Sequence, residues 1–306
     1  MKRTTIALIC LTLTASAGFE ASAQNEMIAS QFVHNQYAIN PAFGGSREGL
    51  TVFGSFRRQW AGISGSPQSL LLTAHTPLKN QQLTTGLSVY RQSIHVSDNT
   101  GVQASVGYRF RIGSGTWMAL ALQPGVSIRS SNWTDTDLME GDDPVFAENE
   151  SNATPLAGFG ISVYAADFFA GFSVPTLMVA DDFGRRDAEF APDQATYILT
   201  GGYLWQADER VHLQPSVMAR YDKRDDLVAN VNLDVIYRRM FWLGASWQTT
   251  GDIIATVACQ ALPQLRVAYS YGYCAGDLKG FNSGTHEVSV QYDFVYPKRV
   301  QSPRFY

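Results

Sequence analysis

The sequence is poor in cysteine, with three such residues in a chain of 306. Cys10 lies in an apolar stretch near the start, which leaves Cys259 and Cys274 for the rest of the chain. A small secreted domain held together by disulfides carries more cysteines than this. A hairpin centred near residue 263 pairs residue 259 with about residue 267, so the two thiols are poorly placed for a disulfide.

The chain also lacks a hydrophobic run long enough for a transmembrane helix. Residues 6–13 are apolar, but this run is too short to cross roughly 30 Å of hydrocarbon. It follows Lys2 and Arg3 and precedes an A-x-A sequence at residues 21–23, the pattern of a secretory signal peptide. We therefore expect residues 1–23 to be removed by cleavage near Ala23/Gln24.

Neither a basic excess nor a catalytic motif is present. The formal net charge is −4, which gives no indication of a nucleic-acid partner. The sequence contains no G-x-S-x-G elbow, H-E-x-x-H pair or P-loop, so we expect no enzymatic activity and no cofactor. No nucleophile is paired by spacing with His75 or His286, which we expect to face lipid or the membrane interface.

Acidic residues gather in the segment 130–153, where oxygen ligands for calcium are conceivable. The spacing lacks the D-x-[DN]-x-[DN]-G pattern of a calcium loop. A solvated acidic loop is therefore the favoured interpretation, and no metal site is predicted.

What the chain does have is alternation with a period of two, which is typical of strands with two different faces. The pattern is clearest over residues 283–296, and it recurs over 102–112, 211–221, 227–237 and 265–274. Because an export signal precedes these segments, we predict an all-β fold, a transmembrane antiparallel β-barrel in the outer membrane of a Gram-negative bacterium. Its apolar faces would contact outer-membrane lipid and its polar faces the lumen.

The segments with this pattern predict about fourteen strands, with twelve to sixteen possible. They cover residues 48–60, 67–76, 82–93, 99–112, 116–129, 154–164, 167–175, 194–206, 210–221, 226–238, 240–249, 252–261, 264–274 and 284–296. The barrel is thus expected over 48–296, after an N-terminal lead or plug at 24–47 and before a short periplasmic tail at 297–306.

Short and long connections alternate along the predicted strands. The connections near 77–81, 113–115, 165–166, 207–209, 239 and 262–263 are short, and the long ones at 130–153, 176–193 and 275–283 fall between them. Outer-membrane barrels have short periplasmic turns and longer external loops, whereas a soluble β-sandwich has no reason to alternate in this way.

The lumen has two possible states that the sequence does not separate. The polar faces carry residues of both charge signs, which can pair and fill the barrel or can line a water channel: Arg109, Arg111, Arg220, Arg266, Asn232, Asp234, Glu287 and Asp293. A filled lumen is preferred, because the lead at 24–47 can sit in the barrel mouth. The lead can equally bind a periplasmic partner.

A series of short motifs follows the chain in order. They are residues 40–46 (NPAFGGS), 57–62 (RRQWAG), 65–67 (GSP), 73–78 (TAHTPL), 86–90 (GLSVY) and 286–294 (HEVSVQYDF). In these motifs the chain resembles the PorP/SprF family of type IX secretion system outer-membrane proteins. It departs from the family pattern at Ser88, where a second glycine is usual.

The resemblance implies a non-enzymatic role in protein export and gliding motility. Its expected partners are secreted cargo proteins with a type-B C-terminal sorting domain, such as adhesins, and the ring and lipoprotein components of the type IX machinery. An outer-membrane diffusion channel or transporter is the alternative.

Two sets of residues are singled out. The first is a motif with either an architectural or a partner-binding role, in which Pro41 and the glycines shape the chain and Trp60 marks the membrane interface: Asn40, Pro41, Gly44, Arg58, Gln59, Trp60, Gly62, Gly65 and Pro67. The second is the signal of the terminal strand: His286, Tyr292 and Phe294.

Overall fold

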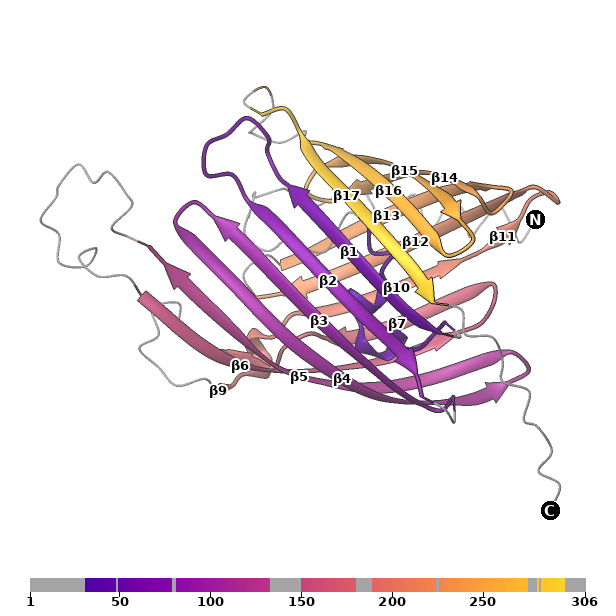
Figure 1. Cartoon of the computed structure of the whole chain (residues 1–306), viewed down its shortest axis with the longest axis horizontal. Helices are drawn as coiled ribbons and strands as arrows, with labels where there is room; N and C mark the ends of the chain where they lie inside the picture. The colour runs from indigo at the N-terminus through magenta and orange to yellow at the C-terminus, as the bar shows by residue number, and fades with distance from the viewer. Residues whose placement is uncertain are drawn as a thin grey trace, which may run out of the picture.

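The computed structural model is an antiparallel β-barrel (Figure 1). It describes residues 31–47, 49–78, 81–132, 150–179, 189–223, 226–274, 280 and 282–294. The expected signal peptide, the tail at 297–306 and most of the acidic segment 130–153 lie outside these residues. Within the described part of the chain, no helix combines the length and the apolar character needed to cross a membrane.

The wall of the barrel consists of fourteen strands when β10 and β11, which both pair with β12, are counted as one interrupted strand. They are β1 (Leu50–Arg58), β2 (Gln68–Pro77), β3 (Leu83–Ile94), β4 (Ser97–Gly113), β5 (Thr116–Ser131), β6 (Glu150–Tyr164), β7 (Phe168–Val174), β10 (Tyr197–Tyr203), β11 (Trp205–Gln206), β12 (Val211–Asp222), β13 (Asp226–Tyr237), β14 (Phe241–Gln248), β15 (Ile253–Leu262), β16 (Leu265–Tyr273) and β17 (Thr285–Phe294).

The barrel is closed, because every wall strand pairs with a neighbour on each side. The first and last strands, β1 and β17, pair antiparallel from Leu50↔Phe294 to Arg58↔His286. The pairing of β10 with β12 completes the ring. Closure leaves no free strand edge within the hydrocarbon, which a membrane barrel requires. The predicted fold class and strand number are therefore confirmed.

The alternation in the sequence is reproduced as two faces of the wall. In β17 the side chains of Glu287, Ser289 and Gln291 are buried in the lumen, whereas Val288 and Val290 are exposed on the outer surface. Large exposed aromatic side chains near the ends of the strands form the girdles that are typical of membrane interfaces. They include Tyr108, Tyr203, Trp205, Tyr221, Tyr237, Phe241, Trp247, Tyr271, Tyr273 and Phe294.

The two ends of the barrel differ in their connections, as expected. At one end, called here the short-turn end, residues 78–82, 114–115, 165–167, 207–210, 238–240 and 263–264 join the strands. The opposite end, called the long-loop end, carries all the long connections, at 59–67, 132–149, 175–196 and 274–284, together with short ones at 95–96, 223–225 and 249–252. β17 ends at the short-turn end, towards the lower right of Figure 1.

The strand expected at 194–206 was wrong in its limits. Pro192–Gln194 forms a short 3-10 helix (η5), β10 begins at Tyr197, and Leu204 interrupts the strand before β11. A further two-stranded ladder, β8 (Met178–Val179) with β9 (Glu189–Phe190), lies in the preceding long loop and was not expected. Short ladders of this kind carry too few residues to show a sequence period.

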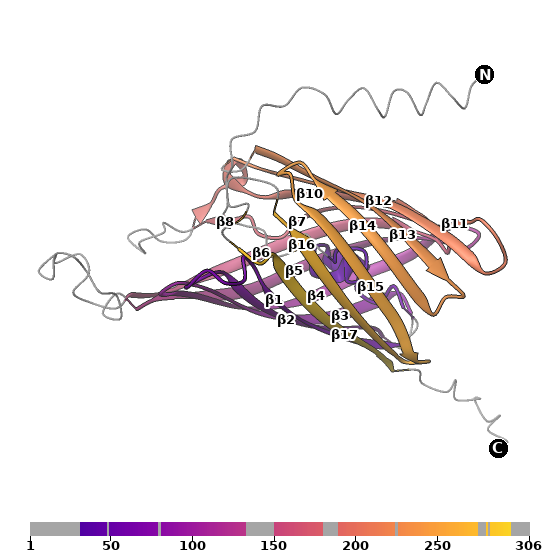
Figure 2. The same cartoon turned by 90° about the horizontal axis from the view of Figure 1, so that it is seen from above.

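Residues 31–47, called here the inner segment, lie inside the barrel (Figures 1 and 2). The inner segment contains two short 3-10 helices, η1 (Gln36–Ala38) and η2 (Pro41–Phe43). Phe32, Tyr37, Ile39 and Phe43 are each at most 2 % exposed, among the most buried large side chains described. The core of the molecule is therefore the contact between the inner segment and the wall.

Candidate functional site

The motif at residues 40–46 builds the helical turn η2. The side chain of Asn40 caps the turn, because its Oδ1 accepts a hydrogen bond from the Ala42 N–H at 2.9 Å. Pro41 occupies the first helical position, where its missing N–H costs nothing. Gly45 has a φ of 67°, a left-handed conformation that glycine adopts without strain.

Asn40 also fixes the turn to the wall. Its Nδ2 donates to the carbonyl oxygens of Ile161 at 3.0 Å and Phe172 at 3.2 Å, which belong to paired positions of β6 and β7. No wall side chain stands between Asn40 and the backbone of these strands, because the residues that face the Asn40 amide are Gly160 and Gly171. A Cβ atom at Gly160 would overlap Asn40 Oδ1, and one at Gly171 would lie 2.7 Å from Asn40 Nδ2. Asn40 therefore requires glycine on both strands.

The side chain of Phe43 packs into a small apolar cluster of the lumen. Its ring lies 6.0 Å from the rings of Tyr164 and Phe169, and Ala119 and Ala121 of β5 form the floor. Short side chains on β5 leave room for a backbone turn against the wall. This packing stabilises η2 in addition to its hydrogen bonds.

A further contact of the inner segment with the wall is made by Tyr37, which packs against His75 of β2. The Tyr37 hydroxyl bonds to Ser105 Oγ at 2.8 Å, and its ring lies 4.9 Å from the imidazole of His75. His75 Nδ1 accepts from the Gly45 N–H at 3.1 Å. The expectation that His75 faces lipid was wrong, because the inward register of β2 carries it into the lumen.

The rest of the inner segment is held by contacts around the ring of strands. These contacts join Asn35 Nδ2 to Thr73 Oγ1 at 3.1 Å, Gln31 Nε2 to Ser270 Oγ at 3.0 Å, Ser162 Oγ to the Ala42 carbonyl at 3.0 Å, and Ser173 Oγ to the Ile39 carbonyl at 2.6 Å. The partners come from β2, β6, β7 and β16. The inner segment thus crosses the lumen and is not confined to one wall.

His34 lies in the inner segment, outside the membrane-spanning strands. Burial lowers the pKa of its imidazole to about 3, and the positive charges of Arg266 and Arg47 contribute in the same direction. His34 is therefore neutral in the folded protein at neutral pH.

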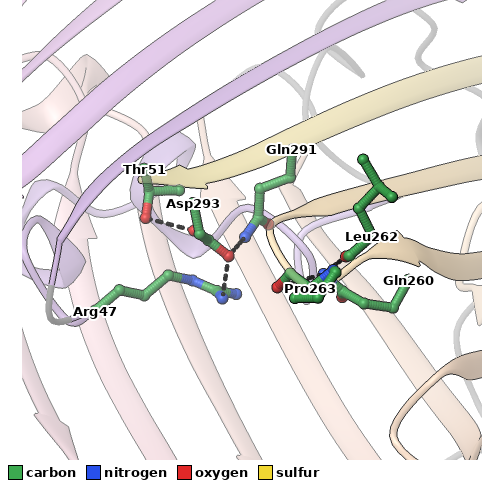
Figure 3. A network of polar contacts seen from close by, with 7 residues as sticks. All are labelled: Arg47, Thr51, Gln260, Leu262, Pro263, Gln291 and Asp293. Atoms are coloured by element: carbon green, nitrogen blue, oxygen red, sulfur yellow. Dashed lines mark hydrogen bonds and ion pairs between the residues drawn. The ribbon is translucent and has the colours of Figure 1, made fainter. Parts of the chain in front are cut away.

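The inner segment ends in a polar network at the short-turn end (Figure 3). Arg47 Nη1 lies 2.9 Å from Asp293 Oδ2 of β17. The same carboxylate accepts from Thr51 Oγ1 at 2.7 Å and from Gln291 Nε2 at 2.9 Å. Beside it, Gln260 Nε2 donates to the carbonyls of the turn that joins β15 and β16. Asp293 therefore connects the inner segment, the first strand and the last strand.

A cavity of about 210 Å³ remains in the lumen beside η1. Its lining combines amide and apolar side chains from opposite sides of the barrel, and among the described residues that line it Arg220 carries the one charge. Lining residues include Ala38, Gln103, Gln123, Ile198, Met218, Arg220 and Gln248.

The second part of the predicted motif lies elsewhere, in the loop between β1 and β2 at the long-loop end. Gln59 N donates to the Pro67 carbonyl at 2.9 Å and closes the loop. Trp60, Gly62 and Gly65 have positive φ values of 48°, 96° and 71°. The sequence motif is therefore divided between the lumen and this loop.

This loop is joined to two neighbouring connections. Ala61 exchanges backbone hydrogen bonds with the loop before β17, through the Gly284 carbonyl at 2.8 Å and the Ser283 N–H at 2.7 Å. The Gly65 carbonyl accepts from the His95 N–H at 3.0 Å. Arg58, at the end of β1, lies opposite His286 in the register. The three connections form one surface at the long-loop end.

The three residues singled out in the terminal strand, His286, Tyr292 and Phe294, lie on its outer face. The rings of Tyr292 and Phe294 are 4.6 Å apart, and His286 Nδ1 lies 2.7 Å from the Tyr269 hydroxyl. His286 thus faces outwards, as expected. Across the described ranges, no group of three or more His, Cys, Asp or Glu residues is arranged to hold a metal ion.

Sequence reasoning did not identify the residues that receive the inner segment. Gly86, Gly160 and Gly171 occupy inward positions where an added Cβ would meet the inner segment, and Gly107 is an inward position whose added Cβ would meet Thr84 and Ala121 of the adjacent strands. The available signal was the small size of these residues on the polar face of several neighbouring strands.

Comparison with known proteins gives one family. Residues 21–292 match the family described as type IX secretion system membrane protein PorP/SprF. A search of curated proteins found no match.

Several solved barrels are similar in structure. The CymD monoaromatic hydrocarbon channel has a TM-score of 0.54 and 8 % identity, covering 90 % of this chain and 95 % of that chain. The toluene transporter TbuX of Ralstonia pickettii has a TM-score of 0.52 and 9 % identity, covering 84 % and 92 %. The outer membrane protein Omp33 of Acinetobacter baumannii has a TM-score of 0.46 and 10 % identity, covering 81 % and 98 %. At these identities the likeness concerns the fold alone.

Proposed function

The chain belongs to the PorP/SprF family of type IX secretion system membrane proteins, and from this premise we propose that it is a non-enzymatic barrel of the export machinery. In this role it aids the export or surface attachment of cargo proteins, such as adhesins with a type-B C-terminal sorting domain. It acts by binding and carries out no bond chemistry. Gliding motility depends on it where the cargo is a motility adhesin.

The single observation that supports binding over transport is the occupied lumen. The inner segment crosses the barrel and is bonded to strands on several sides, from Gln31 at β16 to Asn40 at β6 and β7. A diffusion channel needs a continuous water path, whereas this lumen retains a cavity of about 210 Å³ beside η1. We propose that residues 24–47 act as a plug.

The orientation follows from the loop lengths. In outer-membrane barrels the short turns face the periplasm and the long loops face outwards. We assign the long-loop end to the cell surface after cleavage near Ala23/Gln24. The surface formed by the loop at 59–67 and its two neighbours is then the proposed cargo contact, and Trp60 is its aromatic member at the membrane interface.

The short-turn end would face the periplasm, where the ring and lipoprotein components of the machinery lie. A tail at 297–306 would emerge on the same side. The terminal strand, with His286, Tyr292 and Phe294, is proposed to be read by the barrel-assembly machinery during insertion.

The test is deletion of the gene, followed by measurement of adhesin display at the cell surface. We expect one class of cargo to be retained or shed while other secreted proteins are exported normally. Complementation with a Trp60→Ala, Arg58→Ala variant separates cargo contact from barrel assembly, because both altered residues, at the end of β1 and in the following loop, lie outside the lumen. Normal display of every cargo protein in the deletion strain would contradict the proposal.

A further inference from the structure

Two neighbouring turns at the short-turn end carry three arginines. Arg210 lies in the turn between β11 and β12, and Arg238 and Arg239 lie in the turn between β13 and β14. The turns are in direct contact, because the Arg238 N–H donates to the Arg210 carbonyl at 2.6 Å. All three side chains are exposed. We call these residues the arginine cluster.

The backbone at Arg238 and Arg239 is in a conformation that arginine disfavours. Met240 N donates to the Tyr237 carbonyl at 3.0 Å and closes the turn, and its two central residues have φ values of 51° and 55°. Such hairpin turns usually contain Asn-Gly, because a Cβ atom is strained in the left-handed region. Two arginines here make the turn harder to form. A local strain of this kind points to a role for the side chains.

The arginine cluster lies at the edge of the membrane-facing wall. The guanidinium of Arg238 lies 5.4 Å from the centre of the Tyr237 ring. Tyr237 is exposed on the outer face, and Trp205 and Phe241 are exposed near the same end. Aromatic side chains in this position mark the level of the lipid headgroups. Arg238 therefore lies beside lipid and not over the lumen.

The charges of the arginine cluster are available to a ligand. Asp208 and Glu209 precede Arg210, and the Asp208 carboxylate accepts a hydrogen bond from the Glu209 N–H at 2.7 Å. Within the described ranges, no ion pair joins either carboxylate to one of the three arginines. A guanidinium group presents parallel donors that match a phosphate group.

We propose that the arginine cluster binds the phosphate of an anionic phospholipid in the membrane leaflet at the short-turn end. The cluster supplies two or three guanidinium groups, and the aromatic side chains of the wall contact the acyl chains. This site does not depend on the proposed export function.

The test uses the full mature protein, purified in an uncharged detergent and titrated with phosphatidylglycerol under native mass spectrometry. The matched pair of variants is Arg238→Asn with Arg239→Gly, which removes two charges and relaxes the turn, and Arg91→Asn, which removes an exposed arginine that is paired with Asp98. We expect the double change to weaken phosphatidylglycerol binding about 30-fold, because each arginine near an anionic surface contributes about a factor of five. Arg91→Asn leaves the affinity unchanged.

The double change of Arg238 and Arg239 is expected to affect the melting temperature and phosphatidylglycerol binding in opposite directions. We expect its melting temperature to rise by about 2–4 °C while lipid binding falls, since a strained turn is replaced by a relaxed one. A purely structural role of the arginines would lower the melting temperature, and a solvated turn would leave phosphatidylglycerol binding unchanged. Either result overturns the proposal. Equal binding of phosphatidylcholine, or of free glycerol phosphate in place of the lipid, also overturns it.

Discussion

The two sides of the barrel wall accommodate the lumen contents in different ways. On the side of β4 to β7, inward positions hold small residues such as Gly107, Ala121 and Gly160, and the backbone of η2 lies directly against the wall. On the side of β13 and β14, inward positions hold longer polar side chains such as Asn230 and Gln248, which fill the space themselves and border the cavity. Small inward residues therefore mark where a segment inserts, and long polar residues mark where the wall fills its own lumen.

The largest effect is expected from Gly160→Val on the first side. The added side chain overlaps Asn40 and displaces η2, and such overpacking costs about 3 kcal/mol. Hydrogen–deuterium exchange of residues 31–47 should rise strongly. The matched change on the other side is Gly244→Val, whose Cβ meets the Asp234 side chain and not the inner segment. Equal exchange of residues 31–47 in the two variants would contradict the proposed difference between the two sides of the wall.

Substitution of Asn40 tests the hydrogen bonds of the same side. Asn40→Ala loses the cap and two bonds to the wall and should destabilise the protein by about 2 kcal/mol. Asn40→Asp should be worse, although it retains a capping oxygen, because a carboxylate then faces the carbonyls of Ile161 and Phe172. Unfolding in urea measures both. A milder effect of Asn40→Asp than of Asn40→Ala would contradict this account of the contact.

Acid should loosen the inner segment. The pKa of His34 is lowered from 6.5 to about 3 in the folded protein, so protons bind more readily to the released segment than to the docked one. The docked state therefore loses stability as the pH falls below 6.5, by up to about tenfold in the docking equilibrium at pH 5.5. Hydrogen–deuterium exchange of residues 31–47 at neutral pH and at pH 5.5, after correction for the intrinsic exchange rate, measures this change in the docking equilibrium. His34→Leu should weaken the dependence, and a variant that retains the full dependence would contradict the assignment to His34.

The smallest effect is expected from Arg47→Ala. The ion pair with Asp293 is partly exposed, so its loss should cost about 0.5 kcal/mol and less at high salt. Urea unfolding at low and high ionic strength measures this. A cost that is large and independent of salt would mean that the network of Figure 3 acts as a buried element.

Much of the barrel could be predicted from the sequence, because its strands have one polar and one apolar face. The alternation in β17 and the lengths of the connections are local properties, and both are confirmed. The interruption at Leu204 was not predictable, because β10 and β11 both follow the register of β12 and the pattern alone shows no break.

The site was only partly predictable. The motif around Asn40 was recognised, but its contacts with Gly160 and Gly171 join positions more than a hundred residues apart, which no local pattern encodes. His75 was misplaced for another reason, since it lies on the inward face of β2, where its ring contacts Tyr37 and its Nδ1 accepts from the Gly45 N–H. The two halves of one motif, around Asn40 and Trp60, lie in different parts of the barrel, one in the lumen and one in the loop between β1 and β2.

The central claim is that the protein binds and does not conduct, because its own N-terminal segment occupies the lumen. Conductance of the purified mature protein in planar lipid bilayers tests this most directly, with Gly160→Val as the variant in which the inner segment is displaced. The account predicts a silent wild-type barrel and measurable ion currents from Gly160→Val. Steady currents from the wild-type protein, equal to those of the variant, would contradict it.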